Sequence, residues 1–430
     1  MRYRIVAELL HSADSLPLPA HPGRRITGHQ GVIVHLPSIR LVALAAPLVF
    51  SSSLVAQNAS STPPDSSSPP PSPPRVTASS QSTSALPFSV SGVLYLNYQY
   101  GGLAGARSEN RFDMDRAYLN FRASSGSRDS IRVTLDVFQQ RDATRDQYYR
   151  GWTMRVKYAY LNHDFVEGTG DAMKLWGRLG LLQTVVIEKE EQFWNRGLSQ
   201  AAVEQAGYFN SADAGVALGV TLPNRMGEVY ATVVNGAGYQ SRETDRFKDF
   251  QARLTLTPWA RGSGFLRGLQ LSPWVSVGGQ ASAFATRRGT VQPVADARRK
   301  DRYGFLTTYR DPRLVAGLQI ARKVDVAETA DTTRDVAPTT REVTGALTSA
   351  FAFWRPLGPA SSSPWSVLAR VDDIKPDDAS SGTQRRYIVG TSWDISSRTS
   401  VTFDVQSLSP RNGLSGTASR TYFLHFIANF

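Results

Sequence analysis

Basic side chains recur at alternate positions on the polar faces of many short segments of this sequence. In the segment from Ile131 to Gln140, Arg132 shares a face with Thr134 and Asp136, while the positions between them are apolar. Lysine and arginine bind carboxylate and phosphate oxygens, and arginine can do so through two parallel N–H bonds. Applied along the chain, the alternation predicts one inward basic set suited to small anions: Arg116, Arg122, Arg132, Arg155, Lys157, Lys174, Arg178, Arg253, Arg370 and Arg386.

Aspartates on the same faces could cancel part of that positive charge. The alternation places five of them there: Asp136, Asp213, Asp372, Asp394 and Asp404. One interpretation is a set of cross-strand ion pairs that stiffen a wall. The other is a basic surface that raises the local concentration of anions, and the excess of basic residues favours it.

A second charged cluster lies in the segment from Leu182 to Asn210, which reads as a connector. It holds Glu188, Lys189, Glu190, Glu191 and Arg196. If this connector folds inward, its acids would face the basic set and create a transverse electric field. If it stays outside, the cluster is simply a solvated loop tip.

The sequence gives little support for thiol, catalytic-triad, metal or nucleic-acid chemistry. The chain has no cysteine, which excludes thiol chemistry and disulfides. After residue 57 only His163 and His425 remain, and neither has the neighbours of a catalytic triad or of a metal site. The net charge of +12 comes without a nucleic-acid-binding motif. We therefore expect no enzyme, no cofactor, no metal and no nucleic-acid partner.

The elements that carry the basic set are predicted to be β-strands. Successive side chains of a strand point to opposite faces, so a period of two indicates a strand. The segment from Val401 to Gln406 shows it, with Val401, Phe403 and Val405 opposite polar residues. We expect about 16 strands: 88–99, 111–124, 130–139, 151–163, 172–181, 211–222, 228–236, 246–257, 268–280, 302–310, 313–324, 340–354, 364–373, 385–394, 399–408 and 419–430.

The connectors between these strands alternate between short and long. Short turns such as Asp311–Pro312 follow long segments such as Ala281–Asp301. Short periplasmic turns, long extracellular loops and an even strand number are typical of outer-membrane barrels. The sequence therefore predicts an all-β protein, a transmembrane antiparallel β-barrel over residues 87–430. A soluble β-sandwich would show the same alternation, but not this rhythm.

The N-terminal part of the chain reads as targeting and spacer sequence. The segment from Arg40 to Ala56 has a basic start, an apolar core and a small-residue end, which indicates a signal peptide cleaved near Ala56. We assign residues 1–57 to an extension plus this signal peptide, and we expect translation to begin near Val32 or Val34. Residues 58–86 are rich in proline and serine and are predicted to form a disordered tether.

Aromatic residues mark the last strand and the predicted periplasmic boundary of the barrel. The last strand ends in Phe430 and carries Phe426 on the same face, which is the pattern of the terminal strand recognised by the barrel-assembly machinery. Four tryptophans fall beside predicted periplasmic connectors and would form one aromatic girdle: Trp259, Trp354, Trp365 and Trp393.

Four segments resemble the phosphate-selective porin O/P family: Arg116–Val137, Lys157–Phe165, Asn210–Tyr239 and Asp249–Trp259. The resemblance spans most of residues 88–430. It implies a 16-stranded barrel, commonly trimeric, whose third outer loop folds inward as a constriction. The sequence departs from the family's paired arginine before Ala117, where Arg116 stands alone. It also departs after the fifth strand, at Gly180–Ile187, so the solute stays open.

Together the residues and the resemblance predict an outer-membrane porin that prefers small anions, such as phosphate. Its expected partners are outer-membrane lipid and lipopolysaccharide, the assembly machinery, a small solute and two further copies in a homotrimer. Two other classes stay open: a structural or adhesive barrel whose proline-rich tether is the functional part, and an outer-membrane barrel enzyme.

Overall fold

The computed structural model describes residues 88–139, 151–168, 170–262, 264–282, 297–329 and 338–430. The assignments of residues 1–57 and 58–86 lie outside these residues. In the described part of the chain, no helix has the length and apolar character needed to cross a membrane.

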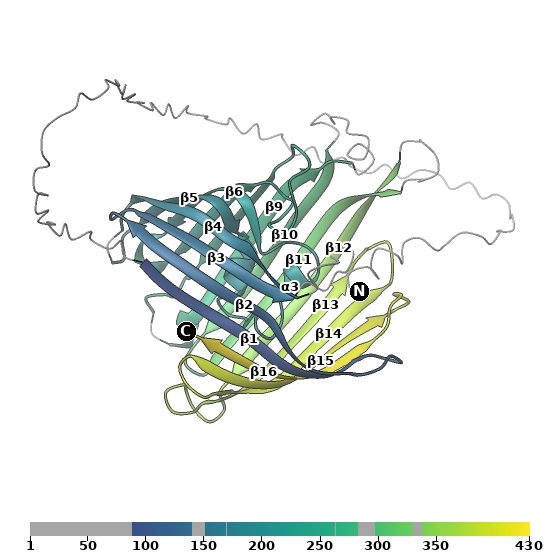
Figure 1. Ribbon diagram of the computed structural model, residues 1–430. Coiled ribbons are helices and arrows are strands. Elements are labelled where there is room, and N and C mark those ends of the chain that lie inside the picture. The colour runs from purple at the N-terminus through teal and green to yellow at the C-terminus, as the bar shows by residue number, and fades with distance from the viewer. Residues whose placement is uncertain (1–87, 140–150, 169, 263, 283–296, 330–337) are drawn as a thin grey trace, which may run out of the picture. The chain divides into compact units, whose positions relative to one another are not determined.

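Sixteen antiparallel strands form one closed sheet, in which each strand pairs with its neighbours in sequence and β1 pairs with β16 (Figure 1). All sixteen predicted strands are present, several of them longer than expected. Their bounds are β1 (Phe88–Leu103), β2 (Glu109–Ser125), β3 (Asp129–Gln139), β4 (Trp152–Val166), β5 (Lys174–Gln183), β6 (Ala212–Thr221), β7 (Gly227–Val234), β8 (Asp249–Leu256), β9 (Leu269–Gln280), β10 (Arg298–Arg310), β11 (Leu314–Thr329), β12 (Thr339–Trp354), β13 (Trp365–Lys375), β14 (Thr383–Asp394), β15 (Thr399–Arg411) and β16 (Ser419–Asn429).

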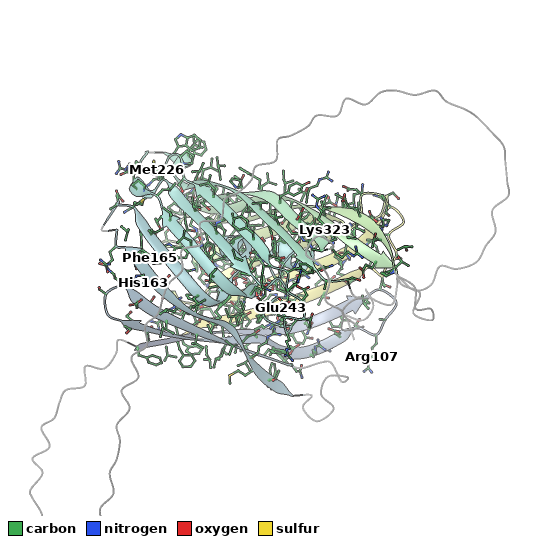
Figure 2. The ribbon with its side chains drawn as sticks, turned by 90° about the horizontal axis from the view of Figure 1, so that it is seen from above. Arg107, His163, Phe165, Met226, Glu243 and Lys323 are labelled. Atoms are coloured by element: carbon green, nitrogen blue, oxygen red, sulfur yellow. The ribbon has the colours of Figure 1, made fainter. Side chains whose placement is uncertain are left out.

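Helices occur only in connectors of the described chain. The connector between β5 and β6, hereafter the third loop (residues 184–211), contains α2 (Val185–Glu190) and α3 (Ala202–Gln205). Two short 3₁₀ turns, η1 (Pro223–Arg225) and η2 (Phe265–Gly268), lie in connectors at the opposite end. In Figure 2, Met226, His163 and Phe165 are labelled at that end of the barrel, and Arg107 and Lys323 are labelled toward the other end.

The outer surface of the barrel is apolar, and its inner surface carries the charged residues. Phe112 is 82% exposed and Leu179 is 61% exposed on the outside, whereas Asp136 and Asp404 are fully buried on the inside. A closed sheet leaves no unpaired backbone edge, and an apolar outer belt is what a lipid bilayer solvates. The fold is therefore the transmembrane β-barrel that the alternation predicted.

The C-terminal residue and the tryptophans complete this arrangement. The backbone of Phe430 exchanges two hydrogen bonds with Gly92 of β1, of 2.9 and 3.0 Å, and its ring lies where a Cβ on Gly92 would be. Phe426 points outward and is 38% exposed. The predicted girdle residues are all exposed at the end where the short turns lie: Trp259, Trp354, Trp365 and Trp393.

Candidate functional site

The third loop lies inside the barrel. Inward-facing side chains from strands far apart in the sheet hydrogen-bond to its backbone, which is possible only if the loop crosses the lumen. These bonds run from Arg253 of β8 to the Val185 carbonyl, from Arg302 of β10 to Tyr208 (3.3 Å), from Arg370 of β13 to Gln200 (2.9 Å) and from Gln406 of β15 to Leu198 (2.9 Å).

The loop is held on an apolar stretch of the inner wall. Val186, Ile187 and Val203 of the loop are fully buried against inward residues of five neighbouring strands, namely Trp274, Leu306, Ala321, Leu347 and Ile374. A second cluster packs Trp194 and Leu198 against Phe351, Leu368, Ile388 and Ile427. Each fully buried aliphatic side chain contributes about 1.5–3 kcal/mol. The loop is thus a packed part of the fold, which the strand pattern alone did not predict.

Two arginines of the predicted pore-lining set lie beneath the loop and do not line an open channel. Arg253 is 1% exposed, and it pairs with Glu188 (2.9 Å) and with Glu228 of β7. Arg370 is 2% exposed and bonds Asp372 (2.9 Å). The prediction that these two arginines line the pore is wrong, because the third loop covers both guanidinium groups. They anchor the loop.

The charged cluster of the third loop is also internal, so the interpretation as a solvated tip is wrong. Burial raises the pKa of Glu190 to about 7, although the charge of Arg370 opposes this, and one carboxylate oxygen accepts the Ala202 N–H at 2.7 Å. Burial and the charge of Arg253 lower the pKa of Lys189 to about 8.

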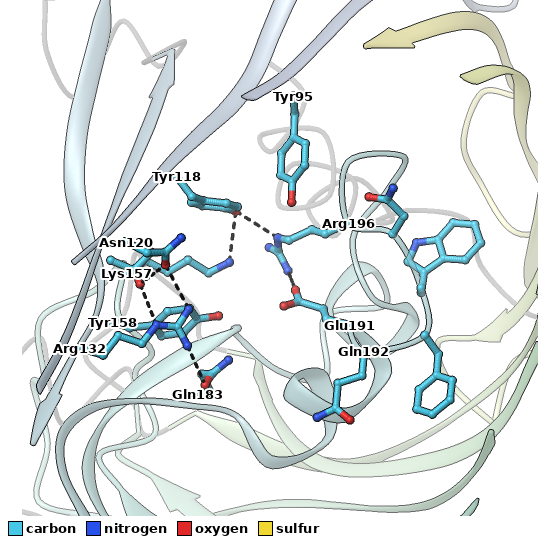
Figure 3. Close-up of a pocket in the computed structure, with 14 residues that line it drawn as sticks. Tyr95, Tyr118, Asn120, Arg132, Lys157, Tyr158, Gln183, Glu191, Gln192 and Arg196 are labelled. Carbon is cyan, nitrogen blue, oxygen red and sulfur yellow. Dashed lines mark hydrogen bonds and ion pairs between the residues drawn. The ribbon is translucent and has the colours of Figure 1, made fainter. Parts of the chain in front are cut away.

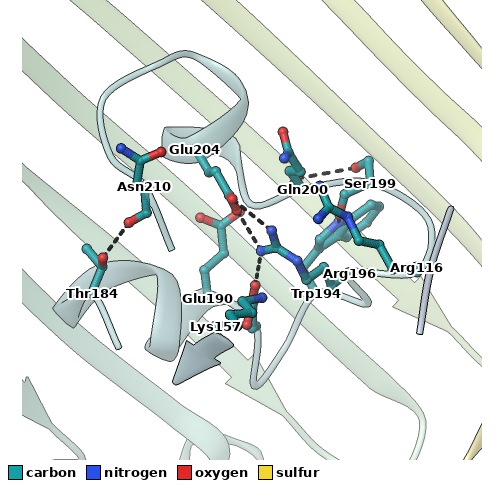
Figure 4. Close-up of polar contacts among 12 residues, drawn as sticks. Arg116, Lys157, Thr184, Glu190, Trp194, Arg196, Ser199, Gln200, Glu204 and Asn210 are labelled. Atoms are coloured by element: carbon teal, nitrogen blue, oxygen red, sulfur yellow. Dashed lines mark hydrogen bonds and ion pairs between the residues drawn. The ribbon is translucent and has the colours of Figure 1, made fainter. Parts of the chain in front are cut away.

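Glu191 and Arg196 form the charged tip of the loop. Arg196 bonds Glu191 and also reaches both oxygens of Glu204, at 2.6 and 2.7 Å (Figure 4). Burial would raise the pKa of Glu191, but the adjacent Arg196 outweighs it and the pKa is lowered. Glu188, Glu191 and Glu204 are therefore held in ion pairs, and Glu191 is the loop carboxylate that lines the remaining space.

A polar cavity of about 380 Å³ lies between the third loop and the opposite wall (Figure 3). Inward residues of β1 to β5 form one side and the loop tip forms the other. Its lining residues are Tyr95, Tyr118, Asn120, Arg132, Thr134, Lys157, Tyr158, Gln183, Glu191, Gln192, Phe193, Trp194, Asn195 and Arg196.

A β-bulge in β4 places two functional side chains next to each other in this cavity. Thr134 of β3 is opposite Tyr158 and Leu135 is opposite Val156, so Lys157 is the extra residue. A bulge can re-aim a side chain that simple alternation would send elsewhere. Here both Lys157 and Tyr158 reach the interior and are buried. The sequence alternation found Lys157 but missed the tyrosine.

The inward cations differ in whether a carboxylate neutralises them. Asp136 pairs with Arg116 (2.7 Å) and with Arg155 (3.0 Å), and not with Arg132 as its spacing along β3 allowed. Arg132 instead bonds three uncharged groups, those of Asn120, Thr134 and Gln183.

Lys157 and Arg178, like Arg132, bond uncharged side chains. The Lys157 ammonium donates to the Tyr118 hydroxyl at 3.1 Å and lies 4.4 Å from the centre of that ring. Arg178 of β5 donates to Asn162 at 3.1 Å and lies 4.1 Å from the ring centre of Trp176. Within the described chain, no ion pair joins Arg132, Lys157 or Arg178 to a carboxylate.

Of the remaining predicted residues, Arg386 of β14 is buried and pairs with Asp372 at 3.5 Å, whereas two others lie toward the end with the short turns. Lys174 pairs with Asp164 at 2.7 Å, and Arg122 is an exposed residue opposite Arg132 in the register of β2 and β3. Among the described residues, no three His, Cys, Asp or Glu side chains gather as a metal-binding group.

A closed barrel of sixteen antiparallel strands with an apolar belt and an inward-folded loop is the architecture of bacterial outer-membrane porins, and this places the barrel in the outer membrane. No family model and no curated protein sequence matches this chain.

Solved porin structures of similar fold were found. An anion-selective porin from Comamonas acidovorans has 11% identity and a TM-score of 0.52, over 80% of this chain and 99% of that one. OmpF of Salmonella typhi in complex with daunomycin has 8% identity and a TM-score of 0.52, over 80% and 97%. OprB of Pseudomonas putida has 9% identity and a TM-score of 0.53, over 80% and 94%. These identities show a shared fold.

Proposed function

We propose that this protein is an outer-membrane porin through which small hydrophilic solutes diffuse, with a preference for anions. The observation that carries the proposal is the row of Arg132, Lys157 and Arg178 on three consecutive strands. Their hydrogen-bond partners are neutral side chains of the described chain. A passing anion therefore meets positive charge that the wall itself does not cancel.

The size of the effect follows from Coulomb's law. Two unit charges 4 Å apart interact by roughly 4 kcal/mol at an effective dielectric near 20. Low-dielectric walls around a narrow opening concentrate such a field and enrich the counter-ion. The paired arginines contribute less, because Asp136 takes up part of the charge of Arg116 and Arg155.

The aromatic neighbours of these cations support the same interpretation. Arg132 lies 4.8 Å from the ring centre of Tyr158, and Lys157 lies 5.2 Å from the same ring. A ring face stabilises a cation without removing its net charge. Aromatic support therefore holds the cations in place while leaving them attractive to anions.

Ion selectivity in planar lipid bilayers tests this proposal. We expect the purified protein to conduct, and the reversal potential in a KCl gradient to show that chloride is more permeant than potassium. A cation preference would contradict the anion proposal. A barrel that conducts nothing would favour the structural or adhesive class instead.

We also propose the assembly that the family resemblance implies, a homotrimer surrounded by outer-membrane lipid and lipopolysaccharide. Phe430 and Phe426 would serve the barrel-assembly machinery during insertion. Light scattering of the detergent-solubilised protein measures the first point, and a monomer would contradict it. Residues 58–86 are proposed as a periplasmic spacer.

A further inference from the structure

The amide side chains around the polar cavity are oriented by hydrogen bonds to their oxygens. Asn120 Oδ1 accepts from Thr134 at 2.7 Å and from Arg132 at 3.2 Å. Gln183 Oε1 accepts from Arg132 at 3.3 Å. Since the Arg132 guanidinium can only donate, the atom that it bonds in each amide must be the oxygen, and the NH₂ group of each amide must point elsewhere.

The same holds for the two amides contributed by the third loop. Gln192 Oε1 accepts from Lys189 at 3.2 Å, and Asn195 Oδ1 accepts from the Gly197 N–H at 2.9 Å. In the described chain, no acceptor for any of these four NH₂ groups is found. Four amide donors from both sides of the cavity are therefore available to a ligand.

Lys157 adds a buried charged donor to this set. Its side chain is 2% exposed, and the Tyr118 hydroxyl is the single acceptor that the described residues offer its three N–H groups. Leaving donors of a charged group unsatisfied in the interior is costly. An acceptor that enters the cavity would remove this cost.

The hydroxyls of Tyr95 and Tyr158 also line the cavity, and Figure 3 shows the Tyr95 hydroxyl directed into it. The one carboxylate in the lining, Glu191, is taken up by Arg196. The cavity thus offers many donors and few free acceptors, so its ligand must be rich in acceptor oxygens.

Size decides between the oxyanions that meet this description. A volume of about 380 Å³ corresponds to roughly twelve water molecules at about 30 Å³ each. One chloride or one tetrahedral phosphate would leave most of the spaced donors unmet. A molecule with several separated carboxylates can reach Arg132 and Lys157 on the strands and the amides on the loop together.

We infer that the polar cavity is a binding site for organic di- and tricarboxylates. This inference rests on the proposed function, because it names the solute class that the anion-preferring channel would carry. The carboxylates would bind Arg132, Lys157 and the amide NH₂ groups of Asn120, Gln183 and Asn195.

Isothermal titration of the detergent-solubilised full chain with citrate, succinate, inorganic phosphate and glucose tests the site. We expect saturable citrate binding that is tighter than phosphate binding, and no binding of glucose. Lys157→Met should weaken citrate binding by roughly tenfold or more, because a charged hydrogen bond is lost. Gln183→Leu, which keeps the fold's charges unchanged, should weaken it by a smaller factor.

Arg128→Met is the matched control, since it removes a cation that is 54% exposed in the turn after β2 and lies outside the cavity lining. It should leave citrate binding unchanged. Absence of saturable citrate binding, equal affinity for phosphate, or equal losses in Arg128→Met and Lys157→Met would each overturn the inference. Conductance of the same preparation is measured separately. A protein that conducts but does not bind citrate would refute the binding site and leave the proposed porin function standing.

Discussion

Replacing Arg132 by glutamate should shift the channel from anion preference toward cation preference. The guanidinium bonds three neutral side chains, so no carboxylate bonded to it offsets its charge toward an ion in the cavity. Two unit charges about 8 Å apart in water interact by roughly 0.5 kcal/mol. Changing the wall by two charge units therefore costs an anion about 1 kcal/mol and favours a cation by about 1 kcal/mol.

The permeability ratio should consequently fall by about 30-fold, since roughly 1.4 kcal/mol corresponds to a factor of ten. Reversal potentials in a KCl gradient measure this ratio. In molar salt the Debye length is about 3 Å, so the shift should become much smaller.

Arg128→Glu is the control, because it makes the same charge change on a 54% exposed side chain in the turn after β2. It should leave the ratio nearly unchanged. An equal shift in both variants would mean that the overall charge of the protein, and not the wall at Arg132, sets selectivity. No shift in Arg132→Glu would refute the reasoning.

Three further predictions concern the loop and the chain end. Arg253→Met should destabilise the barrel by about 2–3 kcal/mol, because buried charge-assisted bonds to the third loop are lost; an unchanged unfolding temperature would contradict the anchoring role. The pKa of Glu190 is raised to about 7, so the folded state holds its proton more tightly than the unfolded state, and stability should fall as pH rises between about 4.5 and 7, by about 3 kcal/mol in total. Glu190→Gln keeps the acceptor for Ala202 and should flatten this pH dependence of the unfolding temperature; a profile identical to that of the natural chain would exclude Glu190 as the cause. Deleting Phe430 removes both backbone bonds to Gly92 and should strongly reduce the amount of protein in the outer-membrane fraction, and normal levels would count against the terminal-strand hypothesis.

The strands could be predicted because lipid outside and a polar interior impose a period of two on each of them. In β15, Phe403 is 48% exposed on the outside, whereas Thr402 is 2% exposed and Asp404 is fully buried on the inside. The same contrast recurs through the barrel. Alternation assigns a residue to the correct face where the strand has no bulge. At Tyr158 it gave the wrong face, because the bulge at Lys157 shifts the alternation by one residue.

Which inward cation stays unpaired could not be predicted from spacing along one strand. Asp136 lies on the same face as Arg132, yet it pairs with Arg116 and Arg155 on the two neighbouring strands. The choice depends on register across strands, which a single sequence does not specify. Likewise Arg132 and Arg253 look equivalent in pattern, but only Arg253 is covered, by a loop about 65 residues earlier in the chain.

The position of the loop does have a trace in the sequence, in apolar residues that occupy inward positions. Leu306, Leu347 and Leu368 face the lumen, where water would otherwise meet them, and all three are buried. An apolar residue on the polar face of a barrel strand indicates that something packs on it. These residues lie on β10, β12 and β13. The cations that no carboxylate pairs with, Arg132, Lys157 and Arg178, lie opposite them on β3 to β5. The inner wall is thus divided, with one half holding the third loop and the other left for charged solutes. Because the loop is held by packing on one half, changes to the cations of the other half should alter selectivity without unfolding the barrel.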